Sequence, residues 1–136
     1  LLPVLRARAK SVLLKTSPML DIDRAFAELG GAAAVHIVEW RGECREVLYL
    51  MTDFAGETPV HAHVIDDEGA ALHSFTLTRA QENAAQATYA PPATYLYEPG
   101  PALMKSGGFN LIAQRYGLAK MHPHTHLYTA DALLPD

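Results

Sequence analysis

The sequence has very little cysteine: Cys44 is the only one among 136 residues. One thiol cannot form an intramolecular disulfide, and a cysteine-based zinc site needs several thiolates, so both features are excluded. Such low cysteine usage is typical of a reducing compartment, and we expect a cytoplasmic location. Long hydrophobic runs are also missing, since LYLM at 48–51 is among the longest. A membrane span needs roughly 20 apolar residues, so we expect no membrane partner.

Positive charge is sparse and is not gathered in a block. The net charge is −4, and residues 49–88 carry one Lys or Arg against six Asp or Glu. Composition alone therefore gives no support for nucleic-acid binding. Hydrophobic residues make up 49% of the chain, which is enough for a packed core.

The first fifty residues follow the order strand, helix, hairpin. SVLLK at 11–15 is a short apolar run that favours a buried strand. DIDRAFAELGG then predicts a helix, with Asp21 or Asp23 capping its first turn and glycines ending it. Two β-rich runs at 34–40 and 45–51, joined by RGEC, predict an antiparallel hairpin.

The second half begins after a polar segment at 53–59 that we interpret as a domain boundary. A second hairpin is expected over 60–65 and 71–77. Thr78 and Gln81 have the spacing of a capping box, which predicts a short helix after them.

The last forty residues alternate between short strands and one helix. TYLYEPG at 94–100 is typical of a strand that runs into a turn. Pro101 then favours a helix that continues to about Tyr116, with Gly107 and Gly108 inside it. LAKM and HLYTA predict two more strands around HPHT.

Four sequence segments resemble methyltransferases of class I that carry a THUMP-like C-terminal domain. They are LLKTSPMLDI at 13–22, HIVEWRGECREVLYLM at 36–51, YLYEPGPALMKSGGFNLIAQRYGL at 95–118 and HLYTAD at 126–131. In that family a fifth parallel strand is followed by a helix and by a hairpin that adds one antiparallel strand to the sheet.

The resemblance implies a mixed α/β (α+β) fold. Residues 1–52 would form the end of a Rossmann-like methyltransferase sheet, and residues 60–136 a small, truncated THUMP-like domain. A Gly-rich cofactor loop and a ribose-binding acid are missing from the sequence. We therefore expect a C-terminal fragment, cut at both ends and inactive alone. The N-terminal core of the parent enzyme would bind S-adenosylmethionine, and none is expected on the fragment.

The resemblance also implies two groups of functional residues. A substrate-side loop would follow the first strand, at the sheet edge where α/β proteins bind ligands; it contains Lys15, Ser17, Pro18, Met19 and Asp21. An ordinary strand-to-helix turn is an equal alternative. RNA is the partner that THUMP-like domains suggest, and Lys105, Arg115 and Lys120 are the candidate phosphate contacts.

Histidines and the cysteine are weaker candidates. His122, His124 and His126 alternate, as do His61 and His63, so each set would share one face of a strand. Imidazoles bind transition metals, but polar surface residues are the simpler interpretation, and we expect no metal. Cys44 has no base at a fixed spacing and is interpreted as a packing residue.

Two other functions stay open. The chain could be a non-catalytic docking domain, or a small metal-binding protein built on the histidines. A sheet cut at its edge could also pair with a second copy and form a homodimer.

Overall fold

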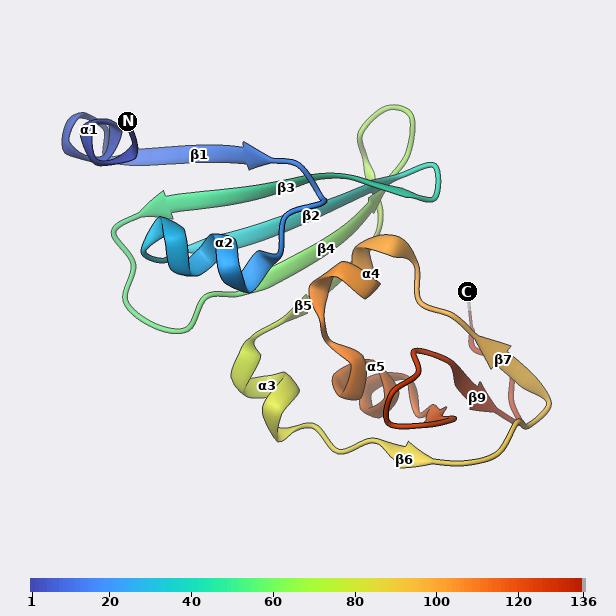
Figure 1. Ribbon diagram of the computed structural model, residues 1–136. Helices are drawn as coiled ribbons and strands as arrows, with labels where there is room; N and C mark the ends of the chain where they lie inside the picture. The colour runs from blue at the N-terminus through green and yellow to red at the C-terminus, as the bar shows by residue number, and fades with distance from the viewer. Residues whose placement is uncertain (136) are drawn as a thin grey trace.

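The computed structural model describes residues 1–135. Its first region is a five-stranded sheet in the order β1-β3-β2-β4-β5 (Figure 1). β3 lies antiparallel between β1 and β2, and β2 pairs in parallel with β4. The predicted order of strand, helix and hairpin is confirmed. The strands are β1 (Ser11–Thr16), β2 (Ala34–Trp40), β3 (Glu43–Thr52), β4 (Val60–Ile65) and β5 (Ala71–Leu77).

The β2–β3 hairpin turns over Arg41 and Gly42, which have φ angles of 51° and 74°. Two consecutive positive φ angles are the requirement of a tight turn that matches the twist of the strands. Gly42 adopts this conformation freely, whereas Arg41 is held in it by a bidentate ion pair with Asp67, with an Nη2–Oδ2 distance of 2.6 Å.

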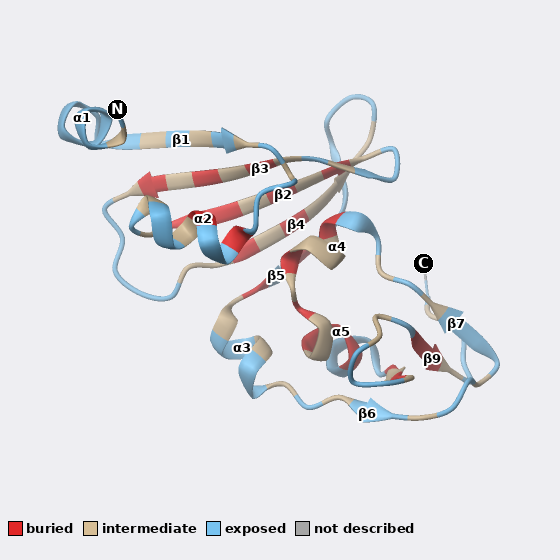
Figure 2. Cartoon of the chain, in the orientation of Figure 1, coloured by how far each residue is buried: buried red, intermediate tan, exposed pale blue. Residues whose placement is uncertain are grey.

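One face of this sheet carries the core. Val35, Ile37 and Tyr49 are buried and belong to one cluster with Ile22 and Ala102. These last two come from α2 (Ile22–Leu29) and α4 (Pro101–Ser106), the helices that lie over this face. Figure 2 shows the resulting alternation of buried and half-buried residues along β2 and β3. The strands are thus half-buried, as expected of a sheet covered on one side.

The expectation that residues 11–15 form a buried strand is wrong. Residues in β1 alternate between exposed and half-buried, and Leu13 is 62% exposed. A fully buried strand needs a neighbour on both edges and cover on both faces. In the described chain β1 has one neighbour, β3, and stands at the edge of the sheet. The short helix α1 (Leu2–Arg8) precedes it.

The second region is a smaller sheet in the order β6-β8-β9-β7. With the first sheet it makes the mixed α+β architecture that the sequence predicts. The predicted linker at 53–59 connects β3 to β4, two strands of the first sheet, and the second sheet begins after Leu77. The second region is the segment after Leu77, and its elements are α3 (Arg79–Ala84), β6 (Thr88–Tyr89), β7 (Tyr95–Tyr97), α4, α5 (Phe109–Tyr116), β8 (Ala119–Lys120) and β9 (Tyr128–Ala130).

The single helix expected from Pro101 to Tyr116 is two helices, α4 and α5, separated at Gly107 and Gly108. Gly107 has a φ of 76° and ends α4 in the left-handed conformation. A Cβ on Gly108 would lie 3.2 Å from Leu77 Cδ1, so a side chain at this position would require the Leu77 side chain to shift. None of the helices between residues 1 and 135 has the length and hydrophobicity needed to cross a membrane.

Candidate functional site

The predicted substrate-side loop leaves the carboxyl end of β1 and leads into α2. Ser17 shapes it: its hydroxyl accepts from the Met19 N–H at 3.2 Å, and its carbonyl accepts from the Leu20 N–H at 3.2 Å. Asp21 then caps α2 by accepting from the Arg24 N–H at 2.8 Å. The Met19 side chain is 89% exposed. Local hydrogen bonds therefore order the loop, which forms a turn at Pro18. The loop presents an apolar tip to solvent.

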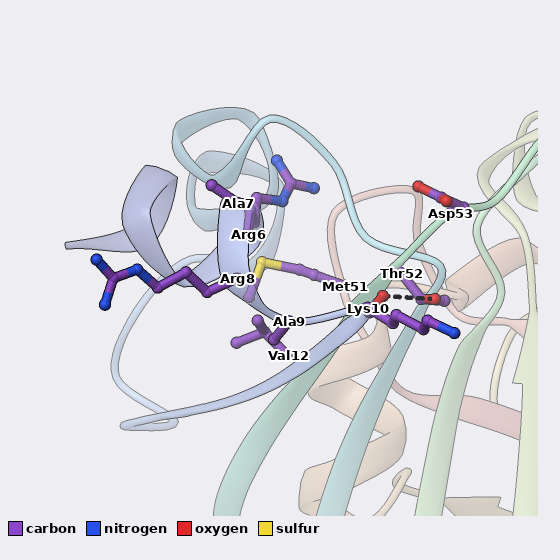
Figure 3. A pocket seen from close by; sticks show the side chains of 9 residues that line it. All are labelled: Arg6, Ala7, Arg8, Ala9, Lys10, Val12, Met51, Thr52 and Asp53. Atoms are coloured by element: carbon purple, nitrogen blue, oxygen red, sulfur yellow. Dashed lines mark hydrogen bonds between the residues drawn. The ribbon is translucent and has the colours of Figure 1, made fainter.

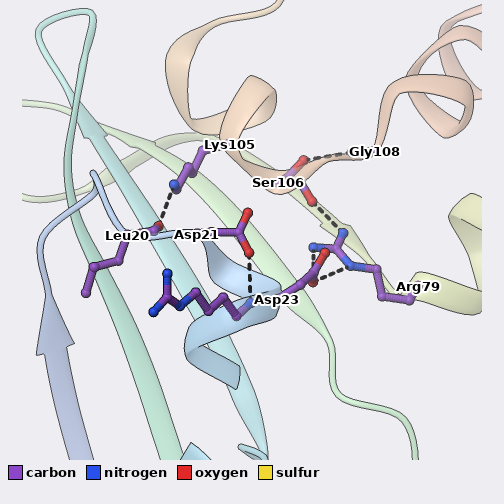
Figure 4. Close-up of polar contacts among 8 residues, drawn as sticks. Leu20, Asp21, Asp23, Arg79, Lys105, Ser106 and Gly108 are labelled. Atoms are coloured by element: carbon purple, nitrogen blue, oxygen red, sulfur yellow. Dashed lines mark hydrogen bonds and ion pairs between the residues drawn. The ribbon is translucent and has the colours of Figure 1, made fainter. Parts of the chain in front are cut away.

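Lys105 connects this loop to the second region. Its ammonium group donates to the Leu20 carbonyl at 2.6 Å, across 85 positions of sequence (Figure 4). Two of the predicted functional groups, the substrate-side loop and one RNA candidate, are thus brought together. Lys15, at the end of β1, instead pairs with Glu46 at 2.9 Å on an exposed surface.

A second contact fixes the start of α2, and sequence reasoning missed it. Arg79 donates to the Asp23 carboxylate from Nε at 3.0 Å and from Nη2 at 2.8 Å. Its Nη1 donates to the carbonyl of Ser106 at 2.7 Å, so one guanidinium joins α2, α3 and α4 (Figure 4). The sequence shows Asp23 and Arg79 as ordinary first-turn residues of two helices, and no local spacing signals their pairing.

An open pocket of about 550 Å³ lies beside Lys105, between the β2–β3 hairpin and α4. Glu98 and Cys44 are among its lining residues. Burial raises the pKa of the Cys44 thiol, an effect that the Lys105 charge reduces and the Glu39 charge increases. The thiol is therefore protonated at neutral pH and is a poor nucleophile, in line with its interpretation as a packing residue. The pocket offers one ammonium and one carboxylate, groups suited to holding a polar molecule.

The other two predicted RNA contacts are engaged within the chain. Arg115 stacks its guanidinium over Phe75 at 4.6 Å and donates to the Thr76 carbonyl. Lys120 is 4% exposed, and its ammonium group lies 3.4 Å from the Pro123 carbonyl. The ammonium group of Lys120 is thus buried within the second region.

His61 and His63 share one face of β4, as predicted, and His36 of β2 joins them. His36 Nδ1 lies 3.1 Å from His63 Nε2, while His63 Nδ1 meets the Ser74 hydroxyl at 2.9 Å. The ring nitrogens therefore hydrogen-bond to one another and to hydroxyls. Among residues 1–135, no group of three or more His, Cys, Asp or Glu residues is arranged to hold a metal ion.

The alternation of His122, His124 and His126 does not correspond to a strand. These residues lie in the loop between β8 and β9, where a turn at 123–124 breaks the pleat that would align them. His126 stacks on Phe109 with ring centroids 3.7 Å apart. The three rings therefore do not share a strand face.

Comparison with known proteins bears on both regions. Residues 95–136 match a family model described as a ferredoxin-like domain. No curated protein matches the chain. The chain is similar to the crystal structure of a putative methyltransferase from Porphyromonas gingivalis W83, with a TM-score of 0.85 and 32% sequence identity. The match covers 98% of this chain and 35% of that one, so this chain spans about a third of its length. Residues 95–136 of the second region are thus similar to a ferredoxin-like domain, and nearly the whole chain shares the fold of part of that putative methyltransferase structure.

Proposed function

We propose that this chain is the carboxyl-terminal part of a cytoplasmic, class I S-adenosylmethionine-dependent methyltransferase. The observation that carries the proposal is the sheet order β1-β3-β2, in which β3 is antiparallel between two strands that run parallel to each other. This is the arrangement with which the catalytic sheet of that family ends. The similarity to the structure of a putative methyltransferase at 32% identity supports the same assignment.

The described residues do not fit the cofactor. A Rossmann-like cofactor site uses a glycine-rich turn and a free helix N-terminus after a strand. The turn from β1 to α2 at 17–21 contains no glycine, and the Asp21 carboxylate already occupies the helix N-terminus. We therefore assign S-adenosylmethionine to residues outside this chain. The free outer edge of β1 is the position where such a core would add its next strand, or where a second copy would pair.

The role proposed for this chain is to shape the substrate side of the site. The loop at 17–21 lies at the carboxyl end of β1, and Lys105 fixes it from the second region. RNA is the substrate class proposed, on the THUMP-like resemblance of residues 60–136. The chain's own residues would position and orient the substrate, since the Cys44 thiol is protonated and the Asp21 carboxylate of the loop is used to cap α2.

Two measurements test the proposal. Isothermal titration of this chain with S-adenosylmethionine should give no binding, whereas a protein extended upstream of Leu1 should bind it. In the extended protein, Lys105→Ala should lower kcat/KM for methyl transfer roughly tenfold by releasing the loop, with an unchanged cofactor Kd. Arg24→Ala, which removes an exposed cation that pairs with Glu28 in the next turn of α2, is the matched control. Micromolar cofactor binding by this chain would overturn the proposal.

A further inference from the structure

A cluster of basic residues with no ion pairs lies at the amino-terminal end of the molecule. Arg6 and Arg8 are in the last turn of α1, and Lys10 follows the helix. Within residues 1–135, no carboxylate lies within ion-pair distance of these three cations. They line a pocket of about 410 Å³ whose wall includes Met51 (Figure 3).

The charge of this pocket is unusual for the chain. Three cations face one acid, Asp53, in a protein whose net charge is −4. Cations at a helix carboxyl end stabilise its dipole, and Arg6 also donates to the Leu29 carbonyl at 3.2 Å. These contacts give Arg6 a structural role. They do not explain Lys10, which lies beyond the helix and has an exposed side chain.

The directions of the side chains indicate the shape of the ligand. In Figure 3 the charged ends of Arg6, Arg8 and Lys10 point in different directions around the pocket, and they do not converge on one point. A single phosphate ion would therefore meet only one of them. An extended anion with several negative groups could contact all three. Val12 and Met51 add an apolar surface between the charges.

We propose that this pocket binds the phosphodiester backbone of single-stranded RNA. The choice of RNA rests on the proposed function, while the anion site rests on the pocket. The pocket lies at the start of β1, and the substrate-side loop follows its end, six residues later. At ~3.3 Å per residue the two are about 20 Å apart, so RNA anchored here must extend over several nucleotides to reach the loop.

Fluorescence anisotropy with a labelled oligouridylate of ten nucleotides tests the proposal on this chain. Three phosphate contacts predict a slope of about −2 for log K against log salt, so affinity should fall roughly 20-fold between 50 and 200 mM salt. The triple variant Arg6→Gln, Arg8→Gln, Lys10→Gln should weaken binding at least tenfold. Gln keeps the helix propensity of these positions. The control is Arg24→Gln, Arg41→Gln, Arg45→Gln, which removes the same charge from residues that are ion-paired.

Two further measurements, NMR shifts and vesicle binding, complete the test. In wild-type protein, the amide NMR signals of Arg8, Lys10 and Thr52 should shift on RNA addition, a readout that needs no variant. Equal weakening by both triple variants, or no binding at all, would overturn the site. Binding of phosphatidylserine vesicles in place of RNA would assign the cluster to a membrane surface and also overturn it. None of these results touches the methyltransferase assignment, which depends on cofactor binding by the extended protein.

Discussion

The two sheets of this molecule are held together in different ways. The first has strands of 6 to 10 residues, whose backbone ladders supply most of the hydrogen bonds. The second has strands of 2 or 3 residues, and side chains complete its backbone bonding. Thr129 Oγ1 accepts from the Ala93 N–H at 2.8 Å and donates to the Tyr95 carbonyl at 2.9 Å. In the second region, single side chains therefore satisfy backbone groups that strand pairing satisfies in the first region.

The helix starts also differ: local side chains cap α2 and α3, whereas distant side chains cap α4 and α5. The amino terminus of α2 is capped by its neighbour Asp21, and that of α3 by Thr78. The helices α4 and α5 begin at glycines with no side-chain cap of their own. Distant carboxylates replace the caps: Glu39 accepts from the Ala102 N–H at 2.9 Å, and Glu82 accepts from two N–H groups of α5. The second region thus depends on particular long-range polar contacts.

The strongest test of this comparison removes the carboxylate that joins the two regions. Glu39 is 6% exposed, and Glu39→Ala leaves the Ala102 N–H buried without an acceptor. We expect a loss of about 3 kcal/mol in the free energy of unfolding, measured by urea denaturation. Glu39→Gln retains an acceptor and should cost about 1 kcal/mol or less. Equal losses from both variants would mean that charge, and not capping, is the important property.

Two buried tyrosines, one in each region, provide a second comparison, in which the expected change in stability is smaller. The Tyr128 hydroxyl donates to the Phe109 carbonyl at 2.9 Å, whereas the Tyr49 hydroxyl is buried with no hydrogen-bond partner among residues 1–135. Tyr128→Phe should destabilise by about 1 kcal/mol, and Tyr49→Phe should be neutral or stabilising. Thermal unfolding of the two variants measures the difference. Burial, reinforced by the Glu82 charge, raises the pKa of Tyr128 to about 12, so its hydroxyl stays protonated throughout such measurements.

The smallest expected effect is a pH dependence that belongs to the first region. Burial, and then the charges of the neighbouring histidines, lower the pKa of His36; burial and His63 lower the pKa of His61. As the pH falls below about 6.5, the unfolded chain takes up protons that the folded chain resists. Stability should therefore decrease between pH 7 and pH 5. Urea midpoints should show a weaker dependence in His36→Gln, His61→Gln than in the control His122→Gln, His124→Gln, which changes two exposed loop residues.

Much of the first region was predictable because its signals are local. Asp21 caps α2 by accepting from the N–H of Arg24, three positions later. The Arg41–Gly42 turn joins two runs with strand propensity. The burial of β1 was mispredicted, because an apolar run does not reveal whether a second strand lies beside it. The strand-to-helix loop at 17–21 was predicted from its sequence, but its contact with Lys105 was not, and its role on the substrate side stays a prediction.

The sequence by itself determined the order of the elements from β1 to β5, the two hairpins, the cap of α3, the choice of Asp21 or Asp23 as the cap of α2, and the segments that resemble methyltransferases. These features depend on residues within a few positions of one another. Only the tertiary structure decided that Gly107 and Gly108 separate two helices, that Glu39 and Glu82 cap them, and that Arg6, Arg8 and Lys10 surround one pocket. The physical reason is that these contacts join groups that meet only after the core has packed, so no local spacing in the sequence records them.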